Sequence, residues 1–269
     1  MSIQALYTAA TGMRSLETKL DVISNNLANV NTTAFKRDRV NFEDLFYRNQ
    51  KVPGVLNNAS GNNTPLGIQV GLGSRVSSIQ PNFMQGAFST TTRQLDIAIE
   101  GRGFLQVQDA STGQTLYTRA GNLTTNANGQ IVLGSAQDGR LIDPPITIPQ
   151  DTTDISIGSD GTVMIKQFGQ NQMQQAGQFQ LTNFINPEGM LKLGENLYSQ
   201  TDASGPPTVG NPGTNGLGQI RQNTLELSNV EPVEELIDLI TTQRAFELNS
   251  QAVQAGDQVL QLVSNLRRF

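Results

Sequence analysis

Three amino acids are absent from this chain of 269 residues, and each absence excludes a class of chemistry. Because there is no histidine, every catalytic triad or dyad that uses an imidazole base is excluded. Because there is no cysteine, the chain has no thiolate nucleophile, no disulfide and no cysteine-ligated zinc site. Tryptophan is also missing, and aromatic residues make up only 6% of the sequence, which disfavours an aromatic-lined ligand pocket.

Charge and hydropathy are both low. Charged residues make up 15% of the chain and hydrophobic residues 36%, below the usual share in globular proteins. The net charge of −5 disfavours a nucleic-acid partner, which requires a basic patch. The apolar runs are too short to span a membrane, and the first residues lack the basic and apolar regions of a signal peptide. These observations predict a chain that is cytoplasmic or exported without a cleaved signal.

Both ends of the chain have the hydrophobic spacing of helices. Residues 3–30 carry apolar side chains every three or four positions, and residues 228–266 carry Leu239, Phe246, Val253 and Leu260 seven positions apart. Neither helix has a helical neighbour in the sequence, so we expect the two to pack on each other. We also expect the ends to become ordered only when further copies of the chain cover their remaining apolar surface.

The centre of the chain predicts short antiparallel strands separated by turns. The expected strands are 95–99, 104–108, 116–119, 130–133, 146–148, 155–157, 163–165, 178–184 and 196–199. Asn128-Gly129 and Asp160-Gly161 are typical of hairpin turns. Residues 48–76 and 204–218 show no periodicity and are expected to be irregular.

The predicted fold class is therefore α+β. Residues 1–47 and 226–269 are expected to form a terminal coiled-coil domain from the two helices. Residues 48–76 are expected to be an irregular connection, and residues 77–225 an all-β antiparallel domain.

The acidic and glycine-rich motifs have structural explanations. The acidic residues Glu231, Glu234, Glu235 and Asp238 lack the histidine that usually completes a helix-bundle metal site, so helix-start electrostatics explains them. The stretch 101–104 has two glycines but not the third glycine of a phosphate-binding loop, which favours a tight turn.

Three other candidates also lack the pattern that chemistry would need. Residues 126–129 lack the carboxylates of a calcium loop, and no carboxylate pair lies in a cleft-like motif. The run 36–39 contains its own counter-charge and is interpreted as a solvated face. The sequence thus predicts no catalytic residue, no cofactor and no metal.

The amide-rich stretch at the end of the first helix carries a resemblance. Asparagine is unfavourable inside a helix, so either the helix frays here or the amides bond to neighbouring chains. Residues 25–29 read Asn-Asn-Leu-Ala-Asn and are followed by Phe35 and Lys36, a pattern that resembles bacterial flagellar rod and hook proteins. Ala34 stands where the pattern usually has glycine. If that position needs a positive φ, alanine costs about 1 kcal/mol there.

The resemblance continues in order along most of the chain. Similar blocks lie at 96–104, at 117–122 followed by 128–129, and at 228–247. By length, and by the stretch 67–73 after a long irregular segment, the chain is most similar to the distal rod branch of the family. The family alternatives are a proximal rod or a hook subunit.

The resemblance implies a structural subunit of the basal body that is not an enzyme. It would polymerise helically into a rigid hollow drive shaft and transmit motor torque to the hook. The implied partners are further copies of the chain, proximal rod proteins, hook subunits, the ring proteins around the rod and the flagellar type III export apparatus, without nucleic acid or membrane insertion. Its implied location is the basal body in the periplasm and cell envelope.

In that polymer, the terminal helices would form the inner wall. The expected assembly interface is Leu6, Ala10, Met13, Leu20, Ile23, Asn25, Asn26, Leu27, Asn29, Leu239, Phe246, Val253 and Leu260. Two other classes stay open: a peptidoglycan-cleaving accessory enzyme that uses two carboxylates, and a surface adhesin. The adhesin leaves the two helical ends unexplained.

Overall fold

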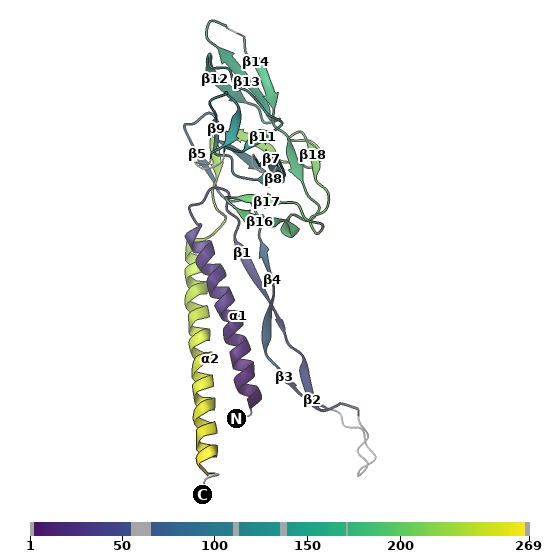
Figure 1. Ribbon diagram of the computed structural model, residues 1–269, viewed down its shortest axis with the longest axis vertical. Coiled ribbons are helices and arrows are strands. Elements are labelled where there is room, and N and C mark those ends of the chain that lie inside the picture. Colours follow the sequence, from purple (N-terminus) through teal and green to yellow (C-terminus); the bar gives the residue numbers. More distant parts are fainter. Residues whose placement is uncertain (1–2, 55–65, 110–112, 135–138, 171, 267–269) are drawn as a thin grey trace. The chain divides into compact units, whose positions relative to one another are not determined.

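The computed structural model describes residues 3–54, 66–109, 113–134, 139–170 and 172–266 (Figure 1). The chain divides into two compact units, and it crosses between them four times. Unit 1 consists of residues 1–28, 38–80 and 231–269, and unit 2 of residues 29–37 and 81–230. A helix near each end and an antiparallel β-rich centre confirm the α+β class.

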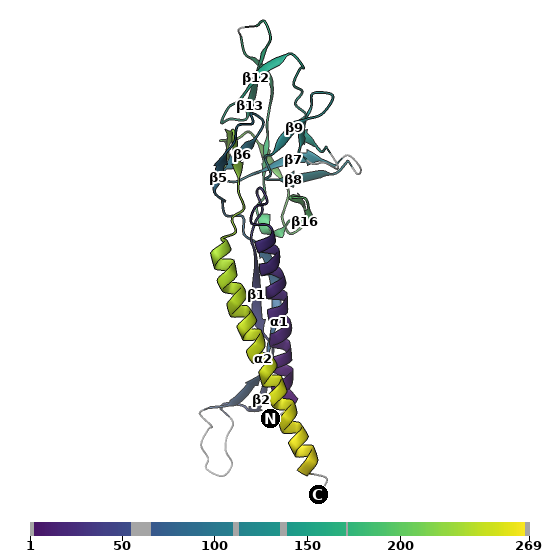
Figure 2. The same ribbon diagram turned by 90° about the vertical axis from the view of Figure 1, so that its left-hand side faces the viewer.

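Unit 1 contains both helices, α1 (Ile3–Ala28) and α2 (Pro232–Leu266), which lie side by side (Figures 1 and 2). They are antiparallel, because Leu6 near the start of α1 contacts Gly256 near the end of α2, and Gly12 contacts Asn249. A Cβ atom on Gly256 would lie 2.4 Å from Leu6 Cδ2, so glycine permits this close approach. The expected contact between the helices is confirmed, whereas their coiled-coil packing and their ordering on assembly stay predictions.

Two antiparallel strand pairs complete unit 1. Strand β1 (Asp38–Asp44) pairs with β4 (Ser74–Pro81), and β2 (Tyr47–Lys51) pairs with β3 (Ile68–Gly71) in the register Tyr47 to Gly71. The expectation that residues 48–76 are irregular is therefore wrong at both ends of that segment, and residues 55–65 lie outside the described residues. Periodicity missed β2 because all five of its side chains are exposed, so no alternation marks it.

Unit 2 is built almost entirely of short strands. They are β5 (Phe88–Thr90), β6 (Ile97–Glu100), β7 (Phe104–Gln108), β8 (Thr115–Thr118), β9 (Leu123–Thr125), β10 (Ile131–Leu133), β11 (Leu141–Asp143), β12 (Thr152–Ile157), β13 (Thr162–Gln167), β14 (Gln174–Gln178), β15 (Leu181–Asn183), β16 (Leu191–Gly194), β17 (Leu197–Ser199), β18 (Thr208–Gly210), β19 (Gln219–Gln222) and β20 (Thr224–Glu226). The main sheet has the order β16-β17-β8-β7-β11-β10-β9, and β15 pairs with both β7 and β18. Smaller sheets are β12-β13-β14, β19-β6 and β20-β5.

Most of the expected strands and both expected hairpins are confirmed in unit 2. The turn at Asn128-Gly129 joins β9 to β10, and the turn at Asp160-Gly161 joins β12 to β13. Three expectations are wrong. Residues 146–148 contribute only an isolated bridge through Thr147, and the loop expected at 204–218 contains β18. The single strand expected at 178–184 is divided between the end of β14 and β15, which belong to different sheets.

The core of unit 2 has two parts. Aliphatic residues of the main sheet and its neighbours, such as Leu105, Leu123 and Ile131, form the larger cluster. A second cluster is aromatic and includes Phe104, Tyr117, Phe184 and Tyr198, with Phe83 packed against it. Edge-to-face contacts hold these rings, for example Tyr117 against Phe184 at 4.8 Å and 87°. This aromatic cluster lies next to the pocket described below.

Candidate assembly surfaces and buried ionic cluster

The predicted seam of α2 is only partly accessible in a single chain. Leu239, Phe246, Val253 and Leu260 are all half-buried within the protomer. On α1, Leu6, Met13, Leu20 and Leu27 are also half-buried, Ile23 is buried and Ala10 is exposed. Except for Ala10, these residues therefore bury much of their apolar surface inside the protomer.

A different set of apolar residues on α2 is exposed, and the sequence analysis missed it. Val233, Leu236, Ile237 and Ile240 lie at spacings of three and four residues, so they share one face of the helix. Val233 is 70% exposed, and Leu248 and Leu262 are exposed further along α2. Exposed apolar residues that share one face of a helix are typical of an interaction site. The heptad count gave these positions less weight because they lie beside the seven-residue seam.

Asn26 in the amide-rich stretch is used inside the protomer. It is 1% exposed, its amide donates to the carbonyl of Asp38 at 2.9 Å, and its side-chain oxygen accepts from the N–H of Asp38 at 2.9 Å. The same amide donates to Oε2 of Glu235 at 3.4 Å. Asn26 therefore joins the end of α1 to the start of β1 and the first turn of α2, which makes it unavailable to a neighbouring chain.

The other members of this stretch have separate environments. Asn25 is exposed, and half-buried Asn29 accepts from the backbone and the hydroxyl of Thr32 in a turn after α1. Glu234 and Glu235 lie in the first turn of α2, as the helix-start interpretation expects, and Glu235 is in addition buried, with 1% of its surface exposed. A buried carboxylate needs hydrogen-bond donors, and the amide of Asn26 supplies one.

A buried ionic cluster lies in unit 2 and consists of Lys36, Arg119 and Glu226. Lys36 Nζ is 2.6 Å from Glu226 Oε1 and donates to the carbonyl of Met84 at 2.7 Å. Arg119 Nε donates to Glu226 Oε2 at 3.1 Å, and the N–H of Gly86 donates to Oε1. One carboxylate therefore faces two cations. The interpretation of residues 36–39 as a solvated face is wrong for Lys36, which is 0% exposed.

Burial dominates the electrostatics of Lys36. Removal of the ammonium group from water lowers the pKa of Lys36 from 10.5 to about 8, although Glu226 acts in the opposite direction and Arg119 adds to the lowering. The guanidinium of Arg119 is also fixed by carbonyl oxygens, those of Ile99, Gly101 and Gly103. The positive φ of both glycines, +107° and +138°, confirms the tight turn expected for residues 101–104.

Hydrogen bonds around the ionic cluster join the two segments of unit 2, residues 29–37 and 81–230, close to the positions where the chain enters and leaves this unit. Ala34 donates to the carbonyl of Glu226 at 2.8 Å, and Asn229 accepts from the N–H of Arg37 at 2.7 Å. The amide of Asn229 also donates to the carbonyl of Asn82 at 2.8 Å. Ala34 has φ +56°, so the left-handed conformation suspected at this position is present.

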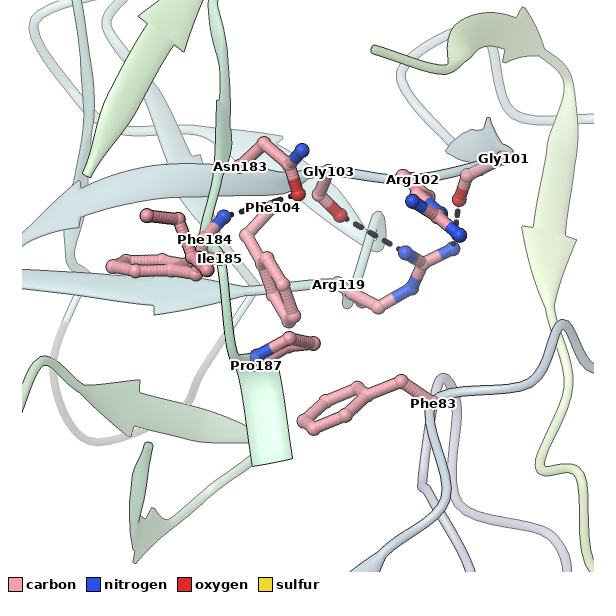
Figure 3. Close-up of a pocket in the computed structure, with 10 residues that line it drawn as sticks. All are labelled: Phe83, Gly101, Arg102, Gly103, Phe104, Arg119, Asn183, Phe184, Ile185 and Pro187. Carbon is pink, nitrogen blue, oxygen red and sulfur yellow. Dashed lines mark hydrogen bonds between the residues drawn. The ribbon is translucent and has the colours of Figure 1, made fainter. Parts of the chain in front are cut away.

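Unit 2 contains a pocket with a volume of about 240 Å³, and Figure 3 shows the residues that line it. Its apolar lining comes from Phe83, Phe104, Phe184 and other residues, and its polar lining includes Arg102 and Asn183. The aromatic-lined pocket that the composition disfavoured is thus present. The expectation rested on the small number of aromatic residues, which does not show where they lie, and the fold gathers several of them in one cluster.

Two further findings concern the described part of the chain. None of its helices is long and apolar enough to cross a membrane. No group of three or more acidic side chains is arranged there to hold a metal ion.

Comparisons with known proteins match three parts of the chain to families. Residues 6–36 match the family described as "Flagella basal body rod protein". Residues 98–165 match the "Flagellar hook protein FlgE/F/G D1 domain", and residues 221–266 match the "Flagellar basal body rod FlgEFG protein C-terminal". Each residue of the ionic cluster lies in a different one of these matched regions.

Proteins similar over nearly the whole length carry the name flagellar basal-body rod protein FlgG. The one from Caulobacter vibrioides is 46% identical over 98% of this chain and 100% of the relative. Those from Agrobacterium fabrum and from Buchnera aphidicola of Schizaphis graminum are each 43% identical, over 97% and 98% of this chain and 98% and 100% of the relatives.

Proposed function

Because the chain belongs to the family of flagellar basal-body rod proteins, we propose that it is a structural subunit of the distal rod. Copies polymerise helically into a rigid hollow drive shaft that transmits motor torque to the hook. The observation that carries this proposal is the likeness to rod proteins over nearly the whole chain. That likeness favours a structural role in the basal body over a peptidoglycan-cleaving enzyme or an adhesin.

The exposed apolar face of α2 supports assembly through the terminal helices. In an open helical polymer, each contact joins two different surfaces of the same chain, so copies add without closing into a ring. The face at Val233, Leu236, Ile237 and Ile240 would be covered by helices of neighbouring copies in coiled-coil packing. The half-buried residues predicted from the sequence, such as Leu239 and Phe246, would contribute their remaining surface to the same contacts.

The pair β2–β3 gives the segment around residues 48–75 a mechanical role. A strand pair that projects exposed side chains, including Ile68 and Val70, can wedge between subunits and hold each copy in one register. A shaft locked in one register is stiff, because its subunits cannot slide between alternative positions.

The remaining partners follow from the position of a rod in the basal body. The subunit would contact proximal rod proteins at one end and hook subunits at the other, with ring proteins around the shaft. It would reach this place through the flagellar type III export apparatus. Export through a narrow channel favours ends that become stably helical only in the polymer.

Electron microscopy of the purified full chain at high concentration tests the proposed function. We expect straight tubes, together with a rise in helical circular dichroism when a dilute solution is concentrated. A chain that stays monomeric at every concentration would overturn the proposal. Full helicity of both ends in dilute solution would overturn only the idea that assembly orders them.

A deletion tests the role of the β2–β3 pair. Because Leu72 donates to the carbonyl of Phe46, removal of residues 48–71 joins two ends that already lie close together. We expect export and polymerisation to continue while the filaments bend. The control is removal of residues 169–173 at the β13–β14 hairpin in unit 2, which should leave filaments straight. Straight filaments from the first deletion would contradict the wedge.

A further inference from the structure

The pocket in Figure 3 combines an apolar lining with an unused positive charge. Phe83, Phe104 and Phe184 line it, and Ile185 on its edge is 85% exposed. Arg119 is buried and shares the carboxylate of Glu226 with Lys36, whereas Arg102 is exposed and forms no ion pair with any residue that the structure describes. No acidic residue belongs to its described lining.

The size of the pocket suits an aromatic side chain. A cavity of about 150 Å³ already holds a benzene ring, and this one measures about 240 Å³. Phe83 and Phe104 meet edge to face at 5.3 Å, and an inserted ring can extend this arrangement. A carboxylate beside that ring would form a charge-assisted hydrogen bond with Arg102. The expected occupant is therefore an exposed aromatic residue next to an acidic one.

The turn between β1 and β2 in unit 1 has this composition. Phe46 is 88% exposed, and Asp44 and Tyr47 beside it are also exposed. Glu43 forms an ion pair with Arg75, so Asp44 is the carboxylate that this turn can offer to a cation of another copy. The Tyr47 hydroxyl is hydrogen-bonded to Asp44, which raises the pKa of Tyr47 and keeps the carboxylate at the turn.

The other strongly exposed phenylalanine does not have this chemistry. Phe168 is 84% exposed, but it lies in a sequence stretch, residues 167–187, that contains no charged residue. Charge complementarity with Arg102 therefore selects the turn at 44–47 over the β13–β14 hairpin. Phe168 is nevertheless a useful control, because it matches Phe46 in residue type and exposure.

We propose that the Asp44–Tyr47 turn of one copy docks into the Phe83–Phe104–Phe184 pocket of another copy, with the ring of Phe46 inside the pocket and Asp44 paired with Arg102. This inference rests on the proposed polymer, in which every copy offers both surfaces. The turn and the pocket are different surfaces of the same chain, so the contact is heterologous and repeats from copy to copy. The contact would hold the β2–β3 pair against the neighbouring copy at the end where β2 begins.

A charge exchange tests the polar half of this contact. Asp44→Arg and Arg102→Asp each place like charges together, and each should raise the critical concentration for polymerisation about tenfold. The double variant restores opposite charges in every contact and should recover to within about threefold of the wild type. A double variant that polymerises no better than its two parents would overturn the pairing.

Cross-linking tests the contact directly, because the chain has no cysteine of its own. Chains with Phe46→Cys are mixed with chains carrying Ile185→Cys, polymerised with wild-type chain and treated with a short bismaleimide. We expect a covalent dimer of the two variants, and none when Phe168→Cys replaces Phe46→Cys. Polymer without the expected dimer would overturn this inference alone. Failure of the wild-type chain to polymerise would overturn the proposed function, and the inference would fall with it.

Discussion

Glu226→Gln is the sharpest test of the buried ionic cluster. Glu226 is 1% exposed, and its carboxylate is the shared partner of Lys36 and Arg119. The amide side chain has nearly the same shape but no charge, so two buried cations lose their counter-charge. Removal of one partner from a buried ion pair costs about 3–5 kcal/mol of folding free energy. We expect unit 2 to lose stability in this range at pH 7.

The pairing also predicts a rescue. In Glu226→Gln, the loss of stability would come from the mutual repulsion and the poor solvation of Lys36 and Arg119. Removal of one of these two charges should therefore recover part of the lost stability. Lys36→Met keeps the length of the side chain and removes its charge, so the double variant should be more stable than Glu226→Gln alone by about 1 kcal/mol or more. The lost hydrogen bond to the carbonyl of Met84 limits the recovery.

The measurement is urea unfolding of the full chain at concentrations that keep it monomeric. Near-ultraviolet circular dichroism follows unit 2 selectively, because Tyr117 and Tyr198 are buried there while Tyr7 and Tyr47 are exposed. A loss below about 1 kcal/mol for Glu226→Gln, or a double variant less stable than the single one, would refute the reasoning.

Three further predictions follow from the same structure. Burial lowers the pKa of Lys36 from its usual 10.5 to about 8, so between these pH values the unfolded chain binds more protons than the folded chain. The free energy of unfolding of unit 2 should therefore rise by up to about 3 kcal/mol as the pH increases through that window. The rise should be absent in Lys36→Met, and equal changes in the stability of both proteins between about pH 7.5 and 9.5 would contradict it. Asn26→Ala should destabilise unit 1 by about 2–3 kcal/mol in thermal or urea unfolding, because it removes buried hydrogen bonds to Asp38 and Glu235. Its control, Glu17→Ala at an exposed position of the same helix, should cost about 0.5 kcal/mol or less. Ile237→Glu should leave the monomer folded but abolish tubes in electron micrographs, whereas Gln251→Glu, an exposed polar position on the same helix, should permit them.

Local patterns in the sequence were sufficient to predict many elements. Apolar spacing of three and four residues predicted α1 and α2, and the observed helices lie within the expected ranges. The turns at Asn128-Gly129 and Asp160-Gly161, and the tight turn at 101–104, were also predictable, because glycine conformations depend on a few neighbouring residues. Strand β2 was missed because its exposed, polar side chains carry no alternation.

The candidate assembly residues were predictable only in part. The seven-residue spacing identified Leu239 and Phe246 from the sequence. The exposed apolar face at Val233 and Ile237 could be identified only from the structure, because the position of α1 determines which side of α2 is covered. Similarly, the sequence left two readings of Asn26 open, fraying or contact with another chain. Its burial against Asp38 and Glu235 gives it a third role, inside the protomer.

The sequence by itself determined the class of elements, the excluded chemistries and the resemblance to a family, because each depends on composition or on neighbours within a few positions. Tertiary structure alone decided the contacts between distant residues. Lys36 and Glu226 are separated by 190 positions and Asn26 and Glu235 by 209, and no local pattern pairs them. A run of charged residues predicts that its lysine is solvated, and only the folded chain shows that Lys36 is buried. Burial and partner choice are properties of the folded chain, and they convert Lys36 from a surface charge into part of the core of unit 2.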